Sequence, residues 1–276
     1  MAQHSSSPGP AYPPAQAIHH EMRTAENSAS FLLPKLNSME QNNPNLSLLD
    51  VGSGSGTISA SFAKAIPNGH VTGVDLNPSI LPRARAVAEM AGLTNIHFQQ
   101  GDSHSLPFAD GTFDIVFCHQ LLTHISAPEA ALREMLRVTK RGGVVAAREG
   151  DFETESVWPQ LPGLAKFHSL TADMMNGRGG TSTAGRQLLS WALKAGARRD
   201  EVTVSFSTWS FHTQSEKNTW AQGIIDQVRN SMGEKGLKAG LTTEDDLEEM
   251  INDWGKWAAK EDSSSAMLHG EILIQK

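Results

Sequence analysis

The feature that most restricts the fold of this chain is a glycine cluster between a predicted strand and a predicted helix. Residues 46–51 form a short apolar run, and Gly52, Gly54 and Gly56 follow directly. Glycine lets a backbone turn tightly and approach a ligand with no Cβ in the way. In a parallel α/β sheet such a turn lies at the carboxyl ends of the strands, where ligands bind. The cluster therefore predicts a parallel sheet with a ligand site at its first strand–helix turn.

Strands and helices alternate after this turn. The apolar runs that read as strands are residues 46–51, 70–76, 96–100, 113–119 and 144–147. Helical patterns separate them: Pro67 follows the first helix, Asn77 and Pro78 open the second, and Gly142 closes a third. A last helix in this part ends at Gly196. Five strand–helix steps predict a parallel sheet with helices on both faces.

The two ends of the chain differ from this pattern. Residues 1–14 are rich in Ser, Pro and Gly and predict a flexible tail. The spacing of apolar residues predicts a helix over 15–36, and the polar stretch 37–45 predicts a loop. Late in the chain, residues 202–211 and 267–274 are β-like, and two helical stretches lie within 216–260.

Composition excludes several classes of protein. The net charge is −7 and the basic pairs are scattered, so we expect no nucleic-acid partner. No apolar run is long enough to span a membrane, and the polar start is no secretory signal. The single cysteine, Cys118, cannot form an internal disulfide or a Cys-based zinc site, and we expect a small buried hydrophobe in a cytoplasmic protein.

The spacing of the glycines separates two cofactor classes. A dinucleotide site requires G-x-G-x-x-G/A, which would place its third small residue at Thr57. The actual spacing is G-x-G-x-G, with Asp50 two residues before it. Asp75 ends the second predicted strand, where a carboxylate accepts hydrogen bonds from ribose hydroxyls in either class. Asp102 follows the third strand. Asp114 begins the fourth strand, and a strand-start role is as much expected for it as a ligand contact.

This ordered set resembles motif I and the following acids of class I methyltransferases that use S-adenosylmethionine. The resemblance implies that Asp102 accepts from the adenine amino group. The cofactor-binding residues that it implies are Arg23, Thr24, Asp50, Gly52, Gly54, Gly56, Asp75, Leu76, Asp102, Ser103 and His119. Within that set, Arg23 and Thr24 are expected at the methionine end, where an arginine pairs with the carboxylate; a solvated helix arginine is equally expected.

Four further stretches resemble UbiE/COQ5-like methyltransferases, a group that includes fungal and bacterial members of unknown substrate. They are residues 20–27, 106–114, 148–151 and 269–273. The likeness covers residues 15–276, but 152–265 departs from the quinone-modifying members. It implies a Rossmann-like, seven-stranded, mostly parallel sheet with helices on both faces and a helical lid. The expected organisation is a tail over 1–14, a helical cap over 15–45 and a methyltransferase domain over 46–276. Lid insertions are expected around 152–185 and 212–265.

Residues at two strand ends are candidates for acid–base chemistry. His119 ends the fourth strand and is the first candidate for a base; Glu149, at the end of the fifth, is the second. Glu149 and Asp151 equally suit the capping of the next helix. His168 is expected on a helix surface. His119 and His124 lack a carboxylate to complete a metal site, so no metal is expected. The tryptophans of the late region suit core packing or an apolar acceptor pocket.

The sequence thus predicts methyl transfer from S-adenosylmethionine to a small-molecule acceptor, with a role in secondary metabolism. One rival is a regulator or scaffold that binds the cofactor without turnover. The other is an NAD-dependent oxidoreductase, against which the glycine spacing and Asp102 speak. The acceptor and the oligomeric state have no signal in the sequence.

Overall fold

The computed structural model describes residues 21–276, which form two compact units. The first contains residues 21–119, 133–146 and 275–276, and the second contains 120–132 and 147–274. The predicted tail over 1–14 and the start of the helix predicted over 15–36 lie outside the described residues. In hydrogen-bonding order the strands run β3-β2-β1-β4-β5-β8-β6, and β7 pairs with β8. This is the Rossmann-like α/β fold that the sequence predicts.

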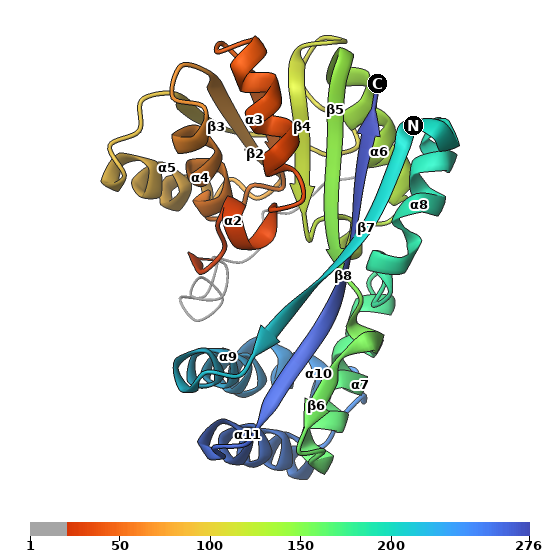
Figure 1. The fold of residues 1–276 in the computed structure, drawn as a ribbon. Helices are drawn as coiled ribbons and strands as arrows, with labels where there is room; N and C mark the ends of the chain where they lie inside the picture. The colour runs from red at the N-terminus through yellow and green to blue at the C-terminus, as the bar shows by residue number, and fades with distance from the viewer. Residues whose placement is uncertain (1–20) are drawn as a thin grey trace. The chain divides into compact units, whose positions relative to one another are not determined.

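The first unit is built on a parallel sheet (Figure 1). Its strands are β1 (Ser47–Val51), β2 (His70–Asp75), β3 (Ile96–Gln100) and β4 (Phe113–His119). β1 lies between β2 and β4, and β3 pairs with β2, all in parallel. Strands buried on both faces read as continuous apolar runs, and Leu48, Leu49 and Val116 are fully buried here. All four predicted strands are confirmed, two of them to the residue.

Helices α4 (Thr57–Ala65) and α5 (Leu81–Met90) pack against β3, and α4 also packs against β2. Phe98 of β3 joins a buried cluster with Leu81 and Ala84 of α5. α5 begins three residues later than predicted. The reason is that Asn77 accepts a hydrogen bond from the Ser79 N–H and forms a turn instead of capping the helix.

The single helix predicted over 15–36 is wrong in the described part. Two helices stand there, α2 (Ala25–Ser28) and α3 (Leu33–Asn42), and α3 covers most of the loop predicted over 37–45. Pro34 explains the break, since proline is tolerated in the first turn of a helix but not in its interior.

The second unit contains most of the chain after β5 (Thr139–Gly150), whose last four residues belong to it. Its other strands are β6 (Ser156–Trp158), β7 (Val202–Phe211) and β8 (Ser264–Gln275). β7 and β8 form a long antiparallel ribbon that Figure 1 shows as two adjacent arrows, with ten residue pairs in register. β6 pairs antiparallel with β8 as well and gives the sheet eight strands, one more than predicted.

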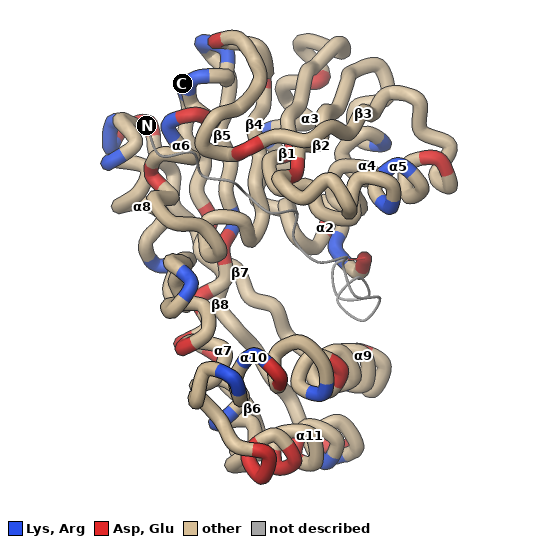
Figure 2. The backbone as a smooth tube through the Cα atoms, turned by 180° about the vertical axis from the view of Figure 1, so that it is seen from behind, with Lys and Arg blue, Asp and Glu red and all other residues tan. Residues whose placement is uncertain are grey.

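Helices of the second unit make a separate core at one end of this ribbon (Figure 1). They are α7 (Pro162–Asn176), α9 (Gln214–Gln227), the π-helix η4 (Val228–Met232), α10 (Gly233–Lys238) and α11 (Glu244–Ala259). Trp254 and Trp257 are fully buried in that core, so core packing is the role of these two tryptophans. Thr243 caps α11 by accepting from the Asp246 N–H. Figure 2 shows acidic residues gathered at the start of this helix.

Two further outcomes concern the ends of α6 (Pro128–Val138) and α8 (Ala184–Ala195). α6 ends at Val138 rather than at the glycines, and Gly142, with φ of +80°, lies inside β5. α8 ends before Gly196, whose φ of +107° confirms the predicted helix stop. Among the described residues, no helix has the length and hydropathy needed to cross a membrane.

Candidate active site

Pairing in the first unit brings the carboxyl ends of β1, β2, β3 and β4 to one edge of the sheet. Val51 lies opposite both Val74 and Cys118, and Asp75 lies opposite Gln100. The glycine turn, Asp75, Asp102 and His119 therefore follow or end neighbouring strands at this edge. Parallel sheets bind ligands here.

The turn after β1 requires its glycines. Gly52, Gly54 and Gly56 all have positive φ, of +77°, +51° and +78°. The N–H groups of Gly52 and Ser53 both donate to the carbonyl oxygen of Val74, at 2.8 and 2.9 Å. Backbone bonds thus fold the turn over the end of β2.

Gly56 also allows a close packing contact. A Cβ at this position would lie 2.7 Å from Cζ of Phe98 and 2.9 Å from Cβ of Ala84. The third glycine of the motif therefore serves helix–strand packing beneath the turn.

Asp75 links the turn to the second strand. Its Oδ2 accepts from the Gly54 N–H and its Oδ1 from the Asn77 N–H, both at 2.9 Å. Burial raises the pKa of Asp75, and these two hydrogen bonds oppose the rise. Each carboxylate oxygen keeps a second lone pair, so the group retains acceptor capacity. Leu76 follows with 56% of its surface exposed.

Asp50 lies inside the sheet and not at its surface. It is 3% exposed, and its Oδ2 accepts from the Ser59 hydroxyl of α4 at 2.5 Å. Burial raises the pKa of Asp50 to about 7. The hydrogen bond from Ser59 lowers this pKa, and the negative charge of Asp75 raises it further. The acid before the glycines thus fixes α4 to β1 under the turn.

Asp102 and Ser103 form a turn after β3. Oδ1 of Asp102 accepts from the His104 N–H at 2.9 Å, and half of the Asp102 side chain is exposed. Ser103 is buried. An exposed carboxylate held by its own turn has oxygens available to a ligand.

The remaining predicted cofactor residues of the first unit lie at its start and at the end of β4. Thr24 precedes α2, and its N–H donates to Asn27 at 2.8 Å. Arg23 is partly buried next to it. His119 is 6% exposed as the last residue of β4, and Cys118 before it is fully buried, as expected.

Asp114 has the strand-start role. Its Oδ2 accepts from the N–H and hydroxyl of Ser47 and from Lys140 Nζ at 2.8 Å. Burial opposes ionisation of Asp114, but the hydrogen bonds from Lys140 and Ser47 outweigh it and hold its pKa below the usual value. This cluster joins the amino ends of strands, so it lies at the edge opposite to the glycine turn.

In the second unit, the Glu149 carboxylate accepts hydrogen bonds from three backbone N–H groups. Its oxygens accept from the N–H groups of Leu121, Leu122 and Thr123, at 3.0, 2.9 and 3.2 Å. Glu149 is fully buried and thereby fixes the segment that becomes the 3₁₀ helix η1 (Leu122–His124). The bonded N–H groups belong to a segment before β5, not to the next helix that the sequence predicts Glu149 to cap, and a role as base stays a prediction.

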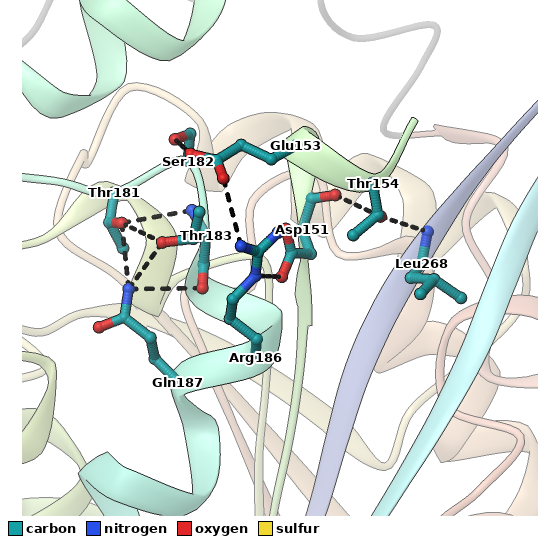
Figure 3. A network of polar contacts seen from close by, with 9 residues as sticks. All are labelled: Asp151, Glu153, Thr154, Thr181, Ser182, Thr183, Arg186, Gln187 and Leu268. Atoms are coloured by element: carbon teal, nitrogen blue, oxygen red, sulfur yellow. Dashed lines mark hydrogen bonds and ion pairs between the residues drawn. The ribbon is translucent and has the colours of Figure 1, made fainter. Parts of the chain in front are cut away.

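Asp151 is paired with an arginine that the sequence did not single out. Figure 3 shows the Arg186 guanidinium in a two-bond contact with Asp151, at 2.5 and 2.6 Å, with Glu153 at 3.2 Å. Arg186 comes from the first turn of α8, so the pair attaches this helix to the end of β5. Nothing in the spacing of these residues signals the contact.

The two other histidines considered from the sequence are His124 and His168. His124 is exposed at the end of η1. His168 lies on α7, and its Nε2 is 2.6 Å from Oε2 of Glu155. Within residues 21–276, no cluster of three or more His, Cys, Asp or Glu is arranged to hold a metal ion.

Known proteins resemble this chain over most of its length. A methyltransferase domain model matches residues 42–203. An uncharacterized methyltransferase of Schizosaccharomyces pombe is 32% identical over 93% of this chain and 92% of its own. The probable methyltransferase ltbC of Aspergillus luteorubrus is 31% identical with the same coverage. UbiE of Roseobacter denitrificans, a ubiquinone/menaquinone biosynthesis C-methyltransferase, is 40% identical but over only 35% of this chain and 39% of its own.

A solved structure of a putative methyltransferase from Bacillus halodurans has the same fold, with a TM-score of 0.54 and 22% identity over 88% of this chain and 98% of that one. The fold and the acid-and-glycine edge define a class I methyltransferase that uses S-adenosylmethionine. The chain belongs to the methyltransferase domain family.

Proposed function

We propose that this protein transfers the methyl group of S-adenosylmethionine to a small-molecule acceptor, in secondary metabolism. When bound, the cofactor supplies an electrophilic methyl group on a sulfonium sulfur. The observation that carries the proposal is the contact of Asp75 with the Gly54 N–H. It places a carboxylate with spare lone pairs beside the backbone of Gly54, which carries no Cβ, and this fits a ribose diol next to the turn.

The proposed cofactor contacts follow from these surroundings. Asp75 accepts from the ribose hydroxyls, Leu76 packs against adenine with its exposed apolar side chain, and Asp102 with Ser103 reads the adenine edge. The glycine turn passes close to the ligand, and Asp50 supports it from below. Arg23 and Thr24 are proposed at the methionine end.

The chain's main task in methyl transfer is alignment. Holding two reactants in line supplies about 7–11 kcal/mol of a barrier in favourable cases, and removing water strengthens the effect. We propose the helices over 152–185 and 212–265 as the lid that excludes water. His119 is the first candidate for a base and Glu149 the second, since backbone bonds already occupy the oxygens of Glu149.

Within the methyltransferase domain family, we propose that this chain belongs to the UbiE/COQ5-like subfamily. Its support is the match to UbiE around the cofactor motifs, while the short coverage argues that the acceptor differs from the quinones of that enzyme.

The direct test uses S-adenosylmethionine labelled in its methyl group, incubated with the full chain and a protein-free extract of small molecules. Transfer of the labelled methyl group to a small molecule, with formation of an equal amount of S-adenosylhomocysteine, supports the proposal. Cofactor binding with no transfer to any fraction favours the regulator or scaffold. Enhanced nicotinamide fluorescence on mixing with NADH, with no binding of S-adenosylhomocysteine, favours the oxidoreductase.

A further inference from the structure

Gln120, the first residue after β4, has an unusual backbone. Its φ is +49°, in the left-handed region that residues other than glycine seldom adopt. Such strain persists where the surroundings fix it, and it gathers at ligand sites. Gln120 also follows a strand at its carboxyl end, which is the ligand edge of this kind of fold.

Two consecutive residues of β5 hold the backbone of Gln120 in place. Its N–H donates to the carbonyl oxygen of Arg148 at 2.9 Å. The Glu149 carboxylate accepts the next three N–H groups of the chain. The strained residue is thus bonded on both sides.

The side chain of Gln120 is fixed by His269 of β8, which is fully buried. Nε2 of Gln120 lies 3.2 Å from Nε2 of His269, and Nδ1 of His269 lies 3.3 Å from the carbonyl oxygen of Met267. A carbonyl only accepts, so the network assigns the ring hydrogen to Nδ1 and makes Nε2 the acceptor for the Gln120 amide.

The support behind His269 is itself rigid. Its ring lies 4.5 Å from that of Trp209, and the guanidinium of Arg148 lies 5.2 Å from the Trp209 ring. Arg148 in turn pairs with Glu271 at 3.2 Å, where both are almost fully buried. The two sequence stretches 148–151 and 269–273 therefore meet in one buried network that ends on Gln120.

This network determines which atom of Gln120 is left for a ligand. With Nε2 directed at His269, Oε1 is the amide atom for which the described residues supply no hydrogen-bond donor. Gly150, at the end of β5, adds no side chain beside it: a Cβ there would lie 3.4 Å from the Gln120 Nε2. Gln120 is a partly exposed residue, and an acceptor atom with a fixed orientation is suited to recognise a donor.

We propose that Oε1 of Gln120 accepts a hydrogen bond from an N–H or O–H group of the methyl acceptor. The inference rests on the proposed function and deepens it, because it assigns the acceptor to amines, amides, alcohols or phenols. Gln120 binds and orients the acceptor, and His269 is a positioning residue that acts through Gln120.

Matched pairs of small molecules test this without a known acceptor. The probes are phenol with anisole, aniline with N,N-dimethylaniline, and benzyl alcohol with benzyl methyl ether. Binding of each to the full chain saturated with S-adenosylhomocysteine is measured by ligand-observed NMR. The variants are Gln120→Met, His269→Phe, which keeps a ring against Trp209, and Gln222→Met as a control on the exposed surface of α9.

For the wild type we expect at least one donor-bearing probe to bind about tenfold more tightly than its methylated partner. Gln120→Met should abolish that ratio, His269→Phe should reduce it, and Gln222→Met should leave it unchanged, with S-adenosylhomocysteine affinity the same in all four proteins. An unchanged ratio in Gln120→Met, or no donor-bearing probe bound at about 10 mM, overturns the inference. If the wild type does not bind S-adenosylhomocysteine, the proposed function itself is contradicted.

Discussion

The backbone N–H of Gly54 donates a 2.9 Å hydrogen bond to Oδ2 of Asp75. This bond joins the two parts of the sequence motif, the glycine turn after β1 and the acid at the end of β2. Because the same carboxylate also holds the Asn77 N–H, its position is fixed before any ligand arrives. A preorganised acceptor loses less entropy on binding than a mobile one.

The first prediction concerns Gly56. Gly56→Ala should lower the free energy of unfolding by about 2–4 kcal/mol, because alanine is strained at positive φ and its Cβ meets Phe98. Gly255→Ala, inside α11 with no atom within 4 Å of the added Cβ, should raise it by about 0.5–1 kcal/mol. Urea denaturation measures both. Equal effects of the two substitutions would contradict the packing role of Gly56.

The second prediction concerns the pH dependence of stability. The folded pKa of Asp50 is about 7 against an ordinary 3.8, so the folded state binds the proton more tightly. Asp50 therefore favours folding most at low pH, and this contribution is lost as the pH rises from about 4 to 7, by at most about 1.4 kcal/mol per pH unit. Asp50→Asn should flatten the curve of unfolding free energy over this range. Parallel curves for the two proteins would show that Asp50 is not the group responsible.

The sequence predicts the strands of the first unit well because its signals are local. A glycine turn and a short apolar run can each be recognised from a few neighbouring residues. The strands predicted over 96–100 and 113–119 match the structure to the residue. The acids at strand ends then follow from the parallel order of the strands.

The errors have physical reasons as well. The apolar spacing over 15–36 predicts one helix, but Pro34 cannot lie in a helix interior and stands in the first turn of α3. β6 is only three residues long and exists through pairing with β8, more than a hundred residues away. Contacts such as Arg186 with Asp151, or Gln120 with His269, join distant segments whose spacing carries no pattern.

The third prediction separates the two roles of Glu149. Glu149→Ala should cost about 3 kcal/mol or more of stability, because three backbone N–H groups lose their acceptor. Glu153→Ala, at a half-exposed carboxylate, should change stability by about 0.5 kcal/mol or less. A Glu149→Ala protein as stable as the Glu153 variant would contradict the structural role.

Glu149→Gln tests the catalytic candidate. The amide oxygen still accepts backbone hydrogen bonds, so much of the stability should return. If Glu149 removes a proton from the acceptor, turnover in the labelled-methyl assay falls about 10²–10⁴-fold with cofactor affinity unchanged. Turnover close to that of the wild type assigns Glu149 to structure alone and leaves His119 as the remaining candidate.

The most direct test of the account is a calorimetric titration of S-adenosylhomocysteine into the full chain and three variants of it. We predict one site in the wild type, and a Kd at least about tenfold weaker in Asp75→Asn and in Asp102→Asn, because each loses a carboxylate acceptor for the adenosyl group. Asp173→Asn, on the exposed surface of α7, should bind like the wild type. The same Kd in all four proteins, or no heat of binding from the wild type at millimolar ligand, would contradict the assignment.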